Sequence, residues 1–192
     1  IDDEKIIEAD AVIISTGASA KWLGIPSEER LNGFGVSACA VCDGFFFKGK
    51  EVAIVGAGDT AAEEASYLAN LCTKVHMIVR RDQMRASLIM QDRVKNNPKI
   101  EIHWNSETEE ILGDSTGVTG IRLKNRVSGA TEEIALQGFF VAIGHQPNTS
   151  IFKDVLAMDK QEYLITEKGS TRTNVEGVFA CGDVQDSTYR QA

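Results

Sequence analysis

A glycine-rich turn between an apolar run and a helical segment is the feature that most constrains this fold. The apolar run that ends at Val55 predicts a buried strand, and Gly56 and Gly58 follow it directly. Small and apolar residues then recur at helical spacing over residues 59–72, and residues 74–79 predict a second strand. Strand, helix and strand within about 30 residues form a β-α-β unit. Such units build parallel sheets covered by helices, so the sequence predicts an α/β fold.

The turn also matches the dinucleotide-binding pattern Gly-x-Gly-x-x-Ala. Its glycines allow a tight turn and let a pyrophosphate approach backbone N–H groups at the helix N-terminus. A glycine turn that binds no ligand is the alternative. We favour binding, because a strand before the motif and a helix after it provide the required context. The candidate cofactor-binding residues of the turn are Gly56, Gly58, Asp59, Thr60 and Ala61.

Three arginines follow the second strand of the unit, at Arg80, Arg81 and Arg85. NAD sites place an acidic residue there for the ribose 2′-hydroxyl, whereas arginine accommodates the 2′-phosphate of NADP. Guanidinium groups match phosphate geometry. A solvated basic turn is the alternative interpretation. The position of the cluster favours NADPH as the nucleotide.

Cys39 and Cys42 form a C-x-x-C pair, and Asp43 follows it directly. A structural zinc site would require a second close pair of ligands, and two buried structural thiols are a further alternative. We favour redox chemistry, in which the carboxyl group of Asp43 serves thiol–disulfide exchange by carrying a proton. A dithiol close to a dinucleotide-binding turn indicates a reductase that passes electrons from a nicotinamide cofactor to a disulfide.

We expect structural roles for the other cysteines and for the aromatic run after Asp43. Cys72 lies on the apolar face of the predicted helix, and Cys181 lies in a strand-to-turn segment, so both are expected to be structural. Residues 45–47 are all phenylalanine; they could form a docking surface, but we favour aromatic filling at a domain edge. The histidines, which lack metal-ligand spacing and therefore predict no metal site, are His76, His103 and His145.

The remaining segments predict a second β layer and two crossings, which are segments where the chain passes from one structural unit into another. Residues 9–17 predict a buried strand, and residues 18–26 and 144–148 are candidate crossings. Shorter strands are predicted after Pro98, and turns between some of them favour an antiparallel β layer added to the parallel sheet. These strands are expected at residues 100–104, 109–112, 118–123, 131–136 and 139–143.

Composition and charge exclude several classes of partner. The formal net charge is −8 and the pI is about 4.9, which argues against nucleic acid or an anionic membrane as partner. No apolar run approaches the roughly 18 residues needed to span a bilayer. No signal peptide precedes the single C-x-x-C pair, so a cytoplasmic location is expected. The chain starts without methionine, and we expect it to be a fragment.

The sequence resembles the low-molecular-weight, bacterial-type thioredoxin reductases, a family of flavoprotein disulfide reductases. The resemblance covers nearly the whole chain in the order of the family. The C-x-x-C-D motif between the two crossings is its most specific mark. The matching segments are residues 37–46, 56–65, 80–86, 140–149, 182–184 and 189–192.

This resemblance implies two Rossmann-like domains, with an NADPH-binding domain at 19–147 inserted into an incomplete FAD-binding domain at 1–18 and 148–192. In the family, the cysteine that matches Cys42 faces the flavin, the one that matches Cys39 attacks the disulfide of thioredoxin, and the acid that matches Asp43 protonates the departing thiolate. The family rotates one domain against the other during turnover and forms homodimers. Further cofactor residues implied by the resemblance are Ile143, Thr16, Gly17, Gly182, Asp183, Arg190, Gln191 and Ala192.

The expected function is therefore NADPH-dependent reduction of thioredoxin, or of a thioredoxin-like protein, through FAD and a Cys39–Cys42 disulfide. A related dithiol flavoprotein that serves a peroxiredoxin system is the first alternative, since it shares the same C-x-x-C-D insert. For the fragment alone, an NADPH-binding module without turnover is the second. We expect the fragment to lack a complete FAD site and to be inactive by itself.

Overall fold

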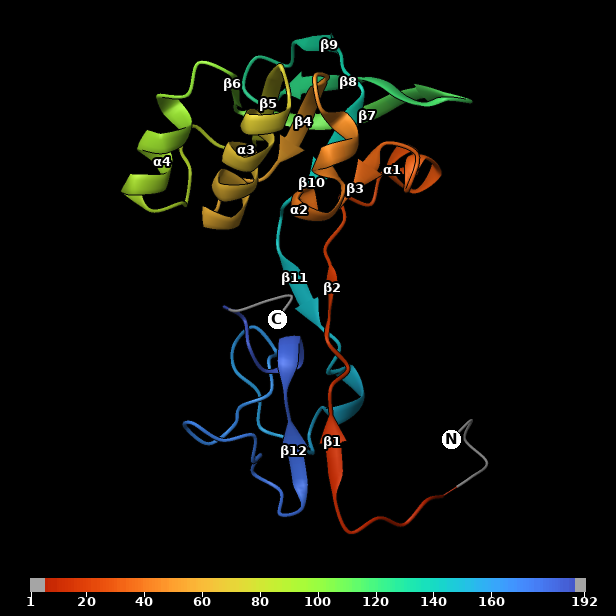
Figure 1. Ribbon diagram of the computed structural model, residues 1–192, viewed down its shortest axis with the longest axis vertical. Helices are drawn as coiled ribbons and strands as arrows, with labels where there is room; N and C mark the ends of the chain where they lie inside the picture. The colour runs from red at the N-terminus through yellow and green to blue at the C-terminus, as the bar shows by residue number, and fades with distance from the viewer. Residues whose placement is uncertain (1–5, 189–192) are drawn as a thin grey trace. The chain divides into compact units, whose positions relative to one another are not determined.

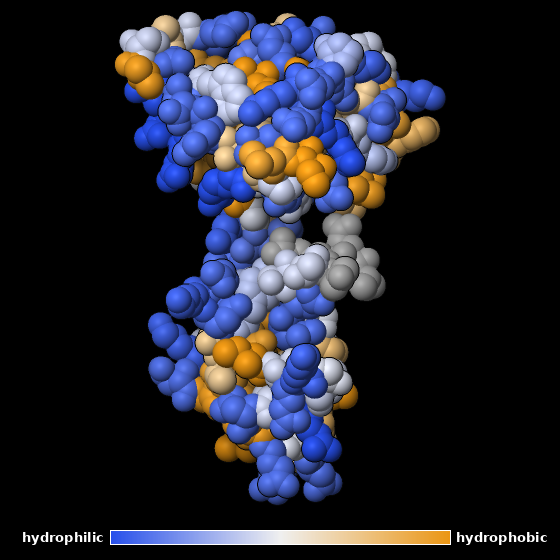
Figure 2. All heavy atoms as spheres, turned by 90° about the vertical axis from the view of Figure 1, so that its left-hand side faces the viewer, coloured by the Kyte–Doolittle hydropathy of each residue, from blue (hydrophilic) through white to orange (hydrophobic). Residues whose placement is uncertain are grey.

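The computed structural model describes residues 6–188 and divides the chain into two compact units (Figure 1). One unit comprises Ile1–Ala20 and His145–Ala192, and the other comprises Lys21–Gly144. Among the described residues, no helix is both long and apolar enough to cross a membrane. On the face shown in Figure 2 the surface is mostly hydrophilic, and its hydrophobic side chains gather in small groups.

A five-stranded parallel sheet forms the centre of the larger unit. Its β4-α3-β5 segment is the predicted β-α-β unit, in which α3 (Asp59–Leu71) connects two neighbouring parallel strands. Strand β4 ends at the predicted residue, β5 begins and ends at the predicted residues, and α3 ends one residue earlier than predicted. The strand order is β3-β10-β4-β5-β6, and the strands comprise Val36–Ser37, Gly138–Val141, Glu51–Val55, Lys74–Val79 and Ile100–Trp104.

Helices cover one face of this sheet. The alanine-rich side of α3 lets the helix approach the sheet closely, and its Ala61, Ala65 and Leu68 are buried against side chains of β4 and β5. Alternate residues of β4 point to opposite faces: Ile54 packs beneath α3, and Ala53 packs on the other side. The other helical segments of the unit are α1 (Pro26–Leu31), α2 (Ala40–Asp43), η1 (Gly44–Phe47) and α4 (Leu88–Lys95).

A three-stranded antiparallel sheet packs on the opposite face. It consists of β7 (Ser106–Asp114), β8 (Gly117–Asn125) and β9 (Thr131–Ala135). The expectation that residues 100–104 and 139–143 also belong to this layer is wrong, because β6 and β10 are strands of the parallel sheet. All four residues of β10 are buried, as expected for a strand covered on both faces.

The smaller unit contains two short strand pairs. Strands β1 (Val12–Ile14) and β12 (Val178–Ala180) are parallel, and β2 (Ala18–Ala20) pairs antiparallel with β11 (His145–Pro147). The expected boundary after residue 18 falls inside β2, and the one after residue 147 falls at the end of β11. The unit also contains η2 (Ser150–Phe152) and η3 (Gly182–Val184). Its core consists of Ile14, Leu156, Leu164, Ala180 and Val184.

Candidate active site

A disulfide joins Cys39 and Cys42 at the start of α2. The S–S distance is 2.06 Å and the two Cα atoms are 5.3 Å apart. Cys39 is the N-cap of α2, and its Sγ accepts a hydrogen bond from the backbone N–H of Cys42 at 3.2 Å. Cys42 is exposed and Cys39 is half-buried. The pair therefore has the spacing and the access to solvent that thiol–disulfide exchange requires.

Asp43 is held beside this disulfide by Ser37, a residue to which the sequence analysis gave no role. The Ser37 hydroxyl donates to the Asp43 carboxylate at 2.6 Å and accepts from the backbone N–H of Cys39 at 3.0 Å. Ser37 is buried at the end of β3, so one fixed side chain connects the acid to the first cysteine. A serine two residues before a C-x-x-C pair was the available signal, but only the fold brings it to Asp43.

The three phenylalanines that follow differ in their environment. Phe47 packs edge-to-face against Phe140 with ring centroids 5.4 Å apart, so it fills the core as expected. Phe45 and Phe46 are 66% and 71% exposed, and the expectation of aromatic filling is wrong for these two. With Val41, which is 60% exposed, they place apolar surface next to the disulfide.

Glu64 is a further residue near the disulfide that sequence reasoning missed. It lies on α3, and its carboxylate accepts a hydrogen bond from the backbone N–H of Ala40, between the two cysteines. Its Oε2 atom is buried without a hydrogen-bond partner among the described residues. Burial, together with the nearby charge of Glu63, raises the pKa of Glu64 to about 7 despite that hydrogen bond.

The same unit contains a cavity of about 600 Å³ at the glycine turn, a volume typical of small-molecule sites. It lies beyond the C-terminal ends of β4 and β5, where open α/β sheets bind ligands. The predicted cofactor residues that line it are Gly56, Arg80, Arg81, Arg85 and Ile143. The other lining residues are Leu23, Ile25, Val55, Ala57, Ile78, Gln83, Ser106, Glu107, Thr108, Glu109 and Lys124.

The two glycines of the turn serve different purposes. Gly56 has a φ of 154°, and a Cβ there would lie 2.3 Å from the Ala142 carbonyl oxygen and 2.6 Å from the Ala61 Cβ. Gly56 therefore permits close packing of strand and helix. Gly58 is the N-cap of α3, and a Cβ there would meet nothing within 4 Å. Its open side leaves room for a ligand at the helix N-terminus.

Asp59 connects the turn to the arginine-bearing loop, and it does not line the cavity. Its Oδ1 accepts from the backbone N–H and the hydroxyl of Ser87, each at 2.8 Å. These hydrogen bonds lower the pKa of Asp59. The Ala57 carbonyl accepts from the backbone N–H groups of Arg85 and Ala86, at 2.7 and 3.0 Å. Thr60, like Asp59, is exposed at the start of α3 without lining the cavity.

The three predicted arginines are exposed at this cavity. Within residues 6–188, none of them forms an ion pair with a carboxylate, whereas Arg122 and Arg126 do. Their guanidinium groups are therefore available to an anionic ligand. A 2′-phosphate is such an anion, and the residues present fit it.

The predicted flavin residues that the structure describes lie at the ends of two paired strands. Thr16 and Gly17 follow β1, and Gly182 and Asp183 follow β12. The Thr16 hydroxyl donates to the backbone carbonyl of Asn148 at 2.8 Å, which secures the first loop. Carboxyl ends of neighbouring parallel strands are the expected place for a dinucleotide. The last predicted flavin residues, Arg190, Gln191 and Ala192, lie outside the described residues.

The two cysteines outside the disulfide, Cys72 and Cys181, are free cysteines. Cys72 is buried and its Sγ donates to the Phe47 carbonyl at 3.4 Å; burial raises the pKa of this thiol to about 11, so it is inert. Cys181 is half-buried. The sequence spacing predicts no metal site at the histidines, yet the fold brings the ring nitrogens of His76 and His103 to 3.0 Å from each other. They lie 27 positions apart, and only the pairing of β5 with β6 brings them together.

The comparisons with known proteins agree with this geometry. The family described as pyridine nucleotide-disulphide oxidoreductase matches residues 1–192. The thioredoxin reductase of Rickettsia prowazekii is 52% identical over 187 residues, which cover 96% of this chain and 60% of the relative. The thioredoxin reductase of Vibrio cholerae is 50% identical over 197 residues, which cover 99% and 62%.

Solved structures of thioredoxin reductases are also similar to this chain. Thioredoxin reductase from Giardia duodenalis matches with a TM-score of 0.85 and 45% identity, over 94% of this chain and 59% of that chain. The Streptococcus pyogenes enzyme matches with a TM-score of 0.85 and 41% identity, at the same coverage. The chain thus spans about 60% of the length of the relatives it matches. With its cysteine pair, its nucleotide-type cavity and these relatives, the chain belongs to the pyridine nucleotide-disulphide oxidoreductase family.

Proposed function

We propose that this chain is the nucleotide- and dithiol-bearing part of an NADPH-dependent, FAD-containing reductase of thioredoxin or a thioredoxin-like protein. One observation carries the proposal: the Cys39–Cys42 disulfide belongs to the same unit as a cavity that presents three guanidinium groups without an ion-pair partner in the described part of the chain. The relatives from Rickettsia prowazekii and Vibrio cholerae are thioredoxin reductases, which supports the substrate.

NADPH is the proposed ligand of the cavity. Its pyrophosphate would lie against the open side of Gly58 at the N-terminus of α3, and Arg80, Arg81 and Arg85 would hold the 2′-phosphate. In the smaller unit, Thr16–Gly17 and Gly182–Asp183 would contribute to the FAD site. When bound, NADPH would supply a hydride, and FAD would provide the redox chemistry that connects this hydride to the disulfide.

The exchange chemistry follows from the cysteines and from Asp43. In the reduced pair, the Cys39 thiolate attacks one sulfur of the partner disulfide, which forms a mixed disulfide and releases a partner thiolate. The Cys42 thiolate then attacks Cys39 Sγ, which restores the Cys39–Cys42 disulfide and releases the second partner thiolate. Asp43, fixed by Ser37, donates a proton to a departing thiolate. The partner gains two electrons, and the cysteine pair loses two.

The exposed Val41, Phe45 and Phe46 would provide the apolar contact for the partner protein. Exposed aromatic side chains beside a reactive group are typical of protein-binding surfaces. The assignment of the two units to NADPH and FAD, the cytoplasmic location and the homodimer expected from the resemblance stay predictions.

A single-turnover experiment on the chain tests this function. The chain is reduced with dithiothreitol, freed of reductant and mixed with oxidised thioredoxin. Each chain is expected to reduce one thioredoxin disulfide, because the pair carries two electrons. Cys39→Ser should abolish the transfer, and Cys42→Ser should trap a mixed disulfide through Cys39. Mass spectrometry under non-reducing conditions measures both products.

Cys181→Ser is the matched control and should transfer normally. Normal transfer by Cys39→Ser would show that the pair is structural and the mechanism wrong. Transfer to a peroxiredoxin-linked thioredoxin-like domain, but not to thioredoxin, would select the peroxiredoxin alternative instead.

A further inference from the structure

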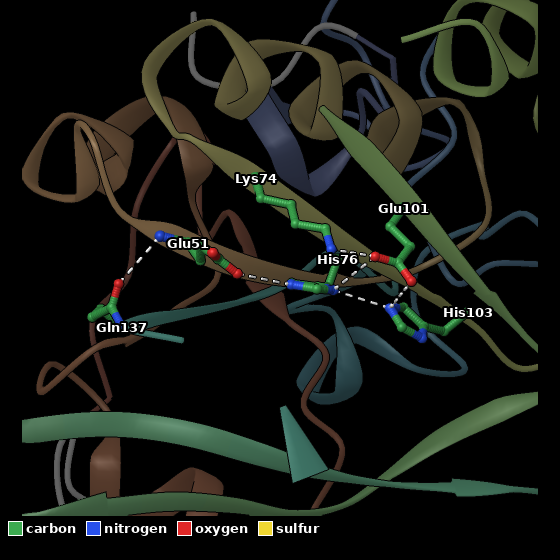
Figure 3. Close-up of polar contacts among 6 residues, drawn as sticks. All are labelled: Glu51, Lys74, His76, Glu101, His103 and Gln137. Atoms are coloured by element: carbon green, nitrogen blue, oxygen red, sulfur yellow. Dashed lines mark hydrogen bonds and ion pairs between the residues drawn. The ribbon is translucent and has the colours of Figure 1, made fainter. Parts of the chain in front are cut away.

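Five polar side chains gather on the face of the parallel sheet that carries the antiparallel layer (Figure 3). The pairing of β4 with β5 places Glu51 beside Lys74, and the pairing of β5 with β6 places His76 beside Glu101. His103 lies two residues further along β6, on the same face. None of the five lines the nucleotide cavity or belongs to the disulfide site. The function proposed above therefore leaves this cluster unexplained.

Three of these groups converge in a way that suits a metal ion. His76 Nδ1 is 3.0 Å from His103 Nε2. The Glu101 carboxylate oxygens lie 4.0 Å from each of these nitrogens, Oε2 from His76 and Oε1 from His103. Ligands at about 2.0–2.1 Å from a tetrahedral ion are about 3.3 Å apart. Shifts of less than an ångström would therefore bring all three donor atoms to ligand distance.

The neighbouring charges strengthen this interpretation. Glu51 Oε2 lies 3.3 Å from His76 Nε2, so that nitrogen can donate its N–H to the carboxylate. This contact presents the lone pair of Nδ1 toward His103, and metal-binding histidines are commonly oriented by a carboxylate in this way. Glu132 of β9 adds a third negative charge near His103. Two imidazoles amid three carboxylates and one lysine form a region that attracts a divalent cation.

The burial of the groups provides both rigidity and access. The side chains of His76 and His103 are 4% and 11% exposed, so the imidazoles are held in place by the surrounding core. Glu101 is 49% exposed and opens the cluster to solvent. Lys74 forms an ion pair with Glu101 through Oε2, which leaves Oε1 on the side of His103. One carboxylate can thus contact Lys74 and a metal ion at the same time.

We propose that His76 Nδ1, His103 Nε2 and the Glu101 carboxylate form a binding site for a divalent transition-metal ion of the zinc class. Water would complete the coordination sphere. Two imidazole ligands favour Zn²⁺ and its transition-metal neighbours over Mg²⁺ or Ca²⁺. Binding requires the proton between the two rings to move, so that His103 adopts the Nδ1–H tautomer. The ion would join edge strand β6 to β5, the strand that leads to Arg80.

Calorimetric titration of the oxidised chain tests the site, after treatment with a chelator and its removal. ZnCl₂ is expected to bind with one tight equivalent and to raise the unfolding temperature. Co²⁺ should give visible absorption typical of four-coordinate nitrogen and oxygen ligation. Glu101→Gln and His103→Gln should each weaken Zn²⁺ binding at least about tenfold, and Glu51→Gln should weaken it by about 10–100-fold.

His145→Gln is the matched control, because His145 is the one histidine of the sequence that is not part of the cluster. This variant should bind Zn²⁺ like the unmodified chain. His76→Gln is a weaker test, because the His76 side chain is buried and its replacement could cause misfolding. Glu101 is half exposed, so Glu101→Gln avoids this problem. Unchanged binding in both Glu101→Gln and His103→Gln would overturn the proposal, as would equal affinity for Mg²⁺ or no Zn²⁺ binding up to millimolar concentration. The last result would establish the cluster as a hydrogen-bonded histidine pair only.

Discussion

Glu64 shows how a single buried carboxyl group links folding to pH. Its pKa is raised to about 7 in the folded chain, against an ordinary value of 4.5, chiefly because burial disfavours the charged form. Between these two values the folded chain binds more protons than the unfolded chain does. The free energy of unfolding therefore falls as the pH rises through this window.

Glu64→Gln should remove this loss of stability, because glutamine keeps the shape and can still accept the hydrogen bond from Ala40. We expect equal unfolding temperatures for the two proteins near pH 4.5. At pH 8 the variant should unfold on the order of 2 °C higher. Calorimetric scans across the pH range measure the difference. Glu63→Gln on the exposed side of α3 should have a smaller effect, and parallel pH profiles for Glu64→Gln and the unmodified chain would contradict the assignment.

The arginines at the cavity lead us to predict different effects of their replacement on NADPH binding and on NADH binding. Replacing Arg80 and Arg81 with glutamine should weaken NADPH binding at least about tenfold, because a charge-assisted hydrogen bond is worth about 1.5–3 kcal/mol. NADH binding should barely change, since NADH has no 2′-phosphate. Fluorescence titration of the chain with each nucleotide measures both affinities. Arg93→Gln on α4 is the control, and equal losses for NADPH and NADH would refute the 2′-phosphate assignment.

At the scale of elements, the C-terminus of α3 depends on a lysine from a distant loop. Lys99 Nζ donates to the carbonyl oxygens of Ala69 and Cys72, each at 3.0 Å. These carbonyls belong to the last turn and the cap of the helix, where a cation also favours the helix dipole. A single side chain thus attaches the loop before β6 to the helix that covers the sheet.

Lys99→Met should lower the free energy of unfolding by about 1 kcal/mol, because two carbonyls lose a charged donor while the aliphatic stem is kept. Urea unfolding followed by circular dichroism gives the value. Lys95→Met is a suitable comparison, since the Lys95 ammonium donates to the nearby Gln91 side chain on the same helix, α4. A Lys99 variant as stable as the Lys95 variant would show that the cap is dispensable.

The β4-α3-β5 unit was predictable from the sequence because its signals are local: an apolar run, two glycines and helical spacing. The position of residues 139–143 was not, because a short apolar run does not reveal which strands it pairs with. Phe139 and Phe140 are both fully buried on opposite faces, and this distinguishes a central parallel strand only once the fold is known. Pairing between distant strands is a tertiary property.

The candidate site also contains residues that the sequence reveals and residues that only the fold reveals. The Cys39–Cys42 pair and the arginines of the cavity could be found from spacing alone, since their chemistry requires neighbours in the sequence. Ser37 and Glu64 gain their roles from contacts that the fold creates around α2. The two clustered histidines come from different strands, and only the strand register places their rings in contact.

At the scale of the whole molecule, the proposal is that the cavity of the larger unit binds NADPH and that the described part of the smaller unit contributes to an FAD site. β1 and β12 form only a two-stranded sheet in the described part of the smaller unit, and isolated strand pairs are marginally stable. We therefore expect the purified chain to be colourless, to bind NADPH, and to lack NADPH-dependent thioredoxin reduction. Absorption at flavin wavelengths and a steady-state assay measure this. A yellow preparation with stoichiometric FAD would show that the flavin site is complete without further segments.

The larger unit begins at Lys21 and ends at Gly144, and the Lys21 N–H donates to the Gly144 carbonyl at 2.9 Å. Its entry and exit are therefore one hydrogen bond apart. A segment with adjoining ends can be gained, lost or exchanged without changing the distance that the host chain must bridge. Recombination at these two points would transfer the arginines of the cavity and the cysteine pair together, as one inherited segment.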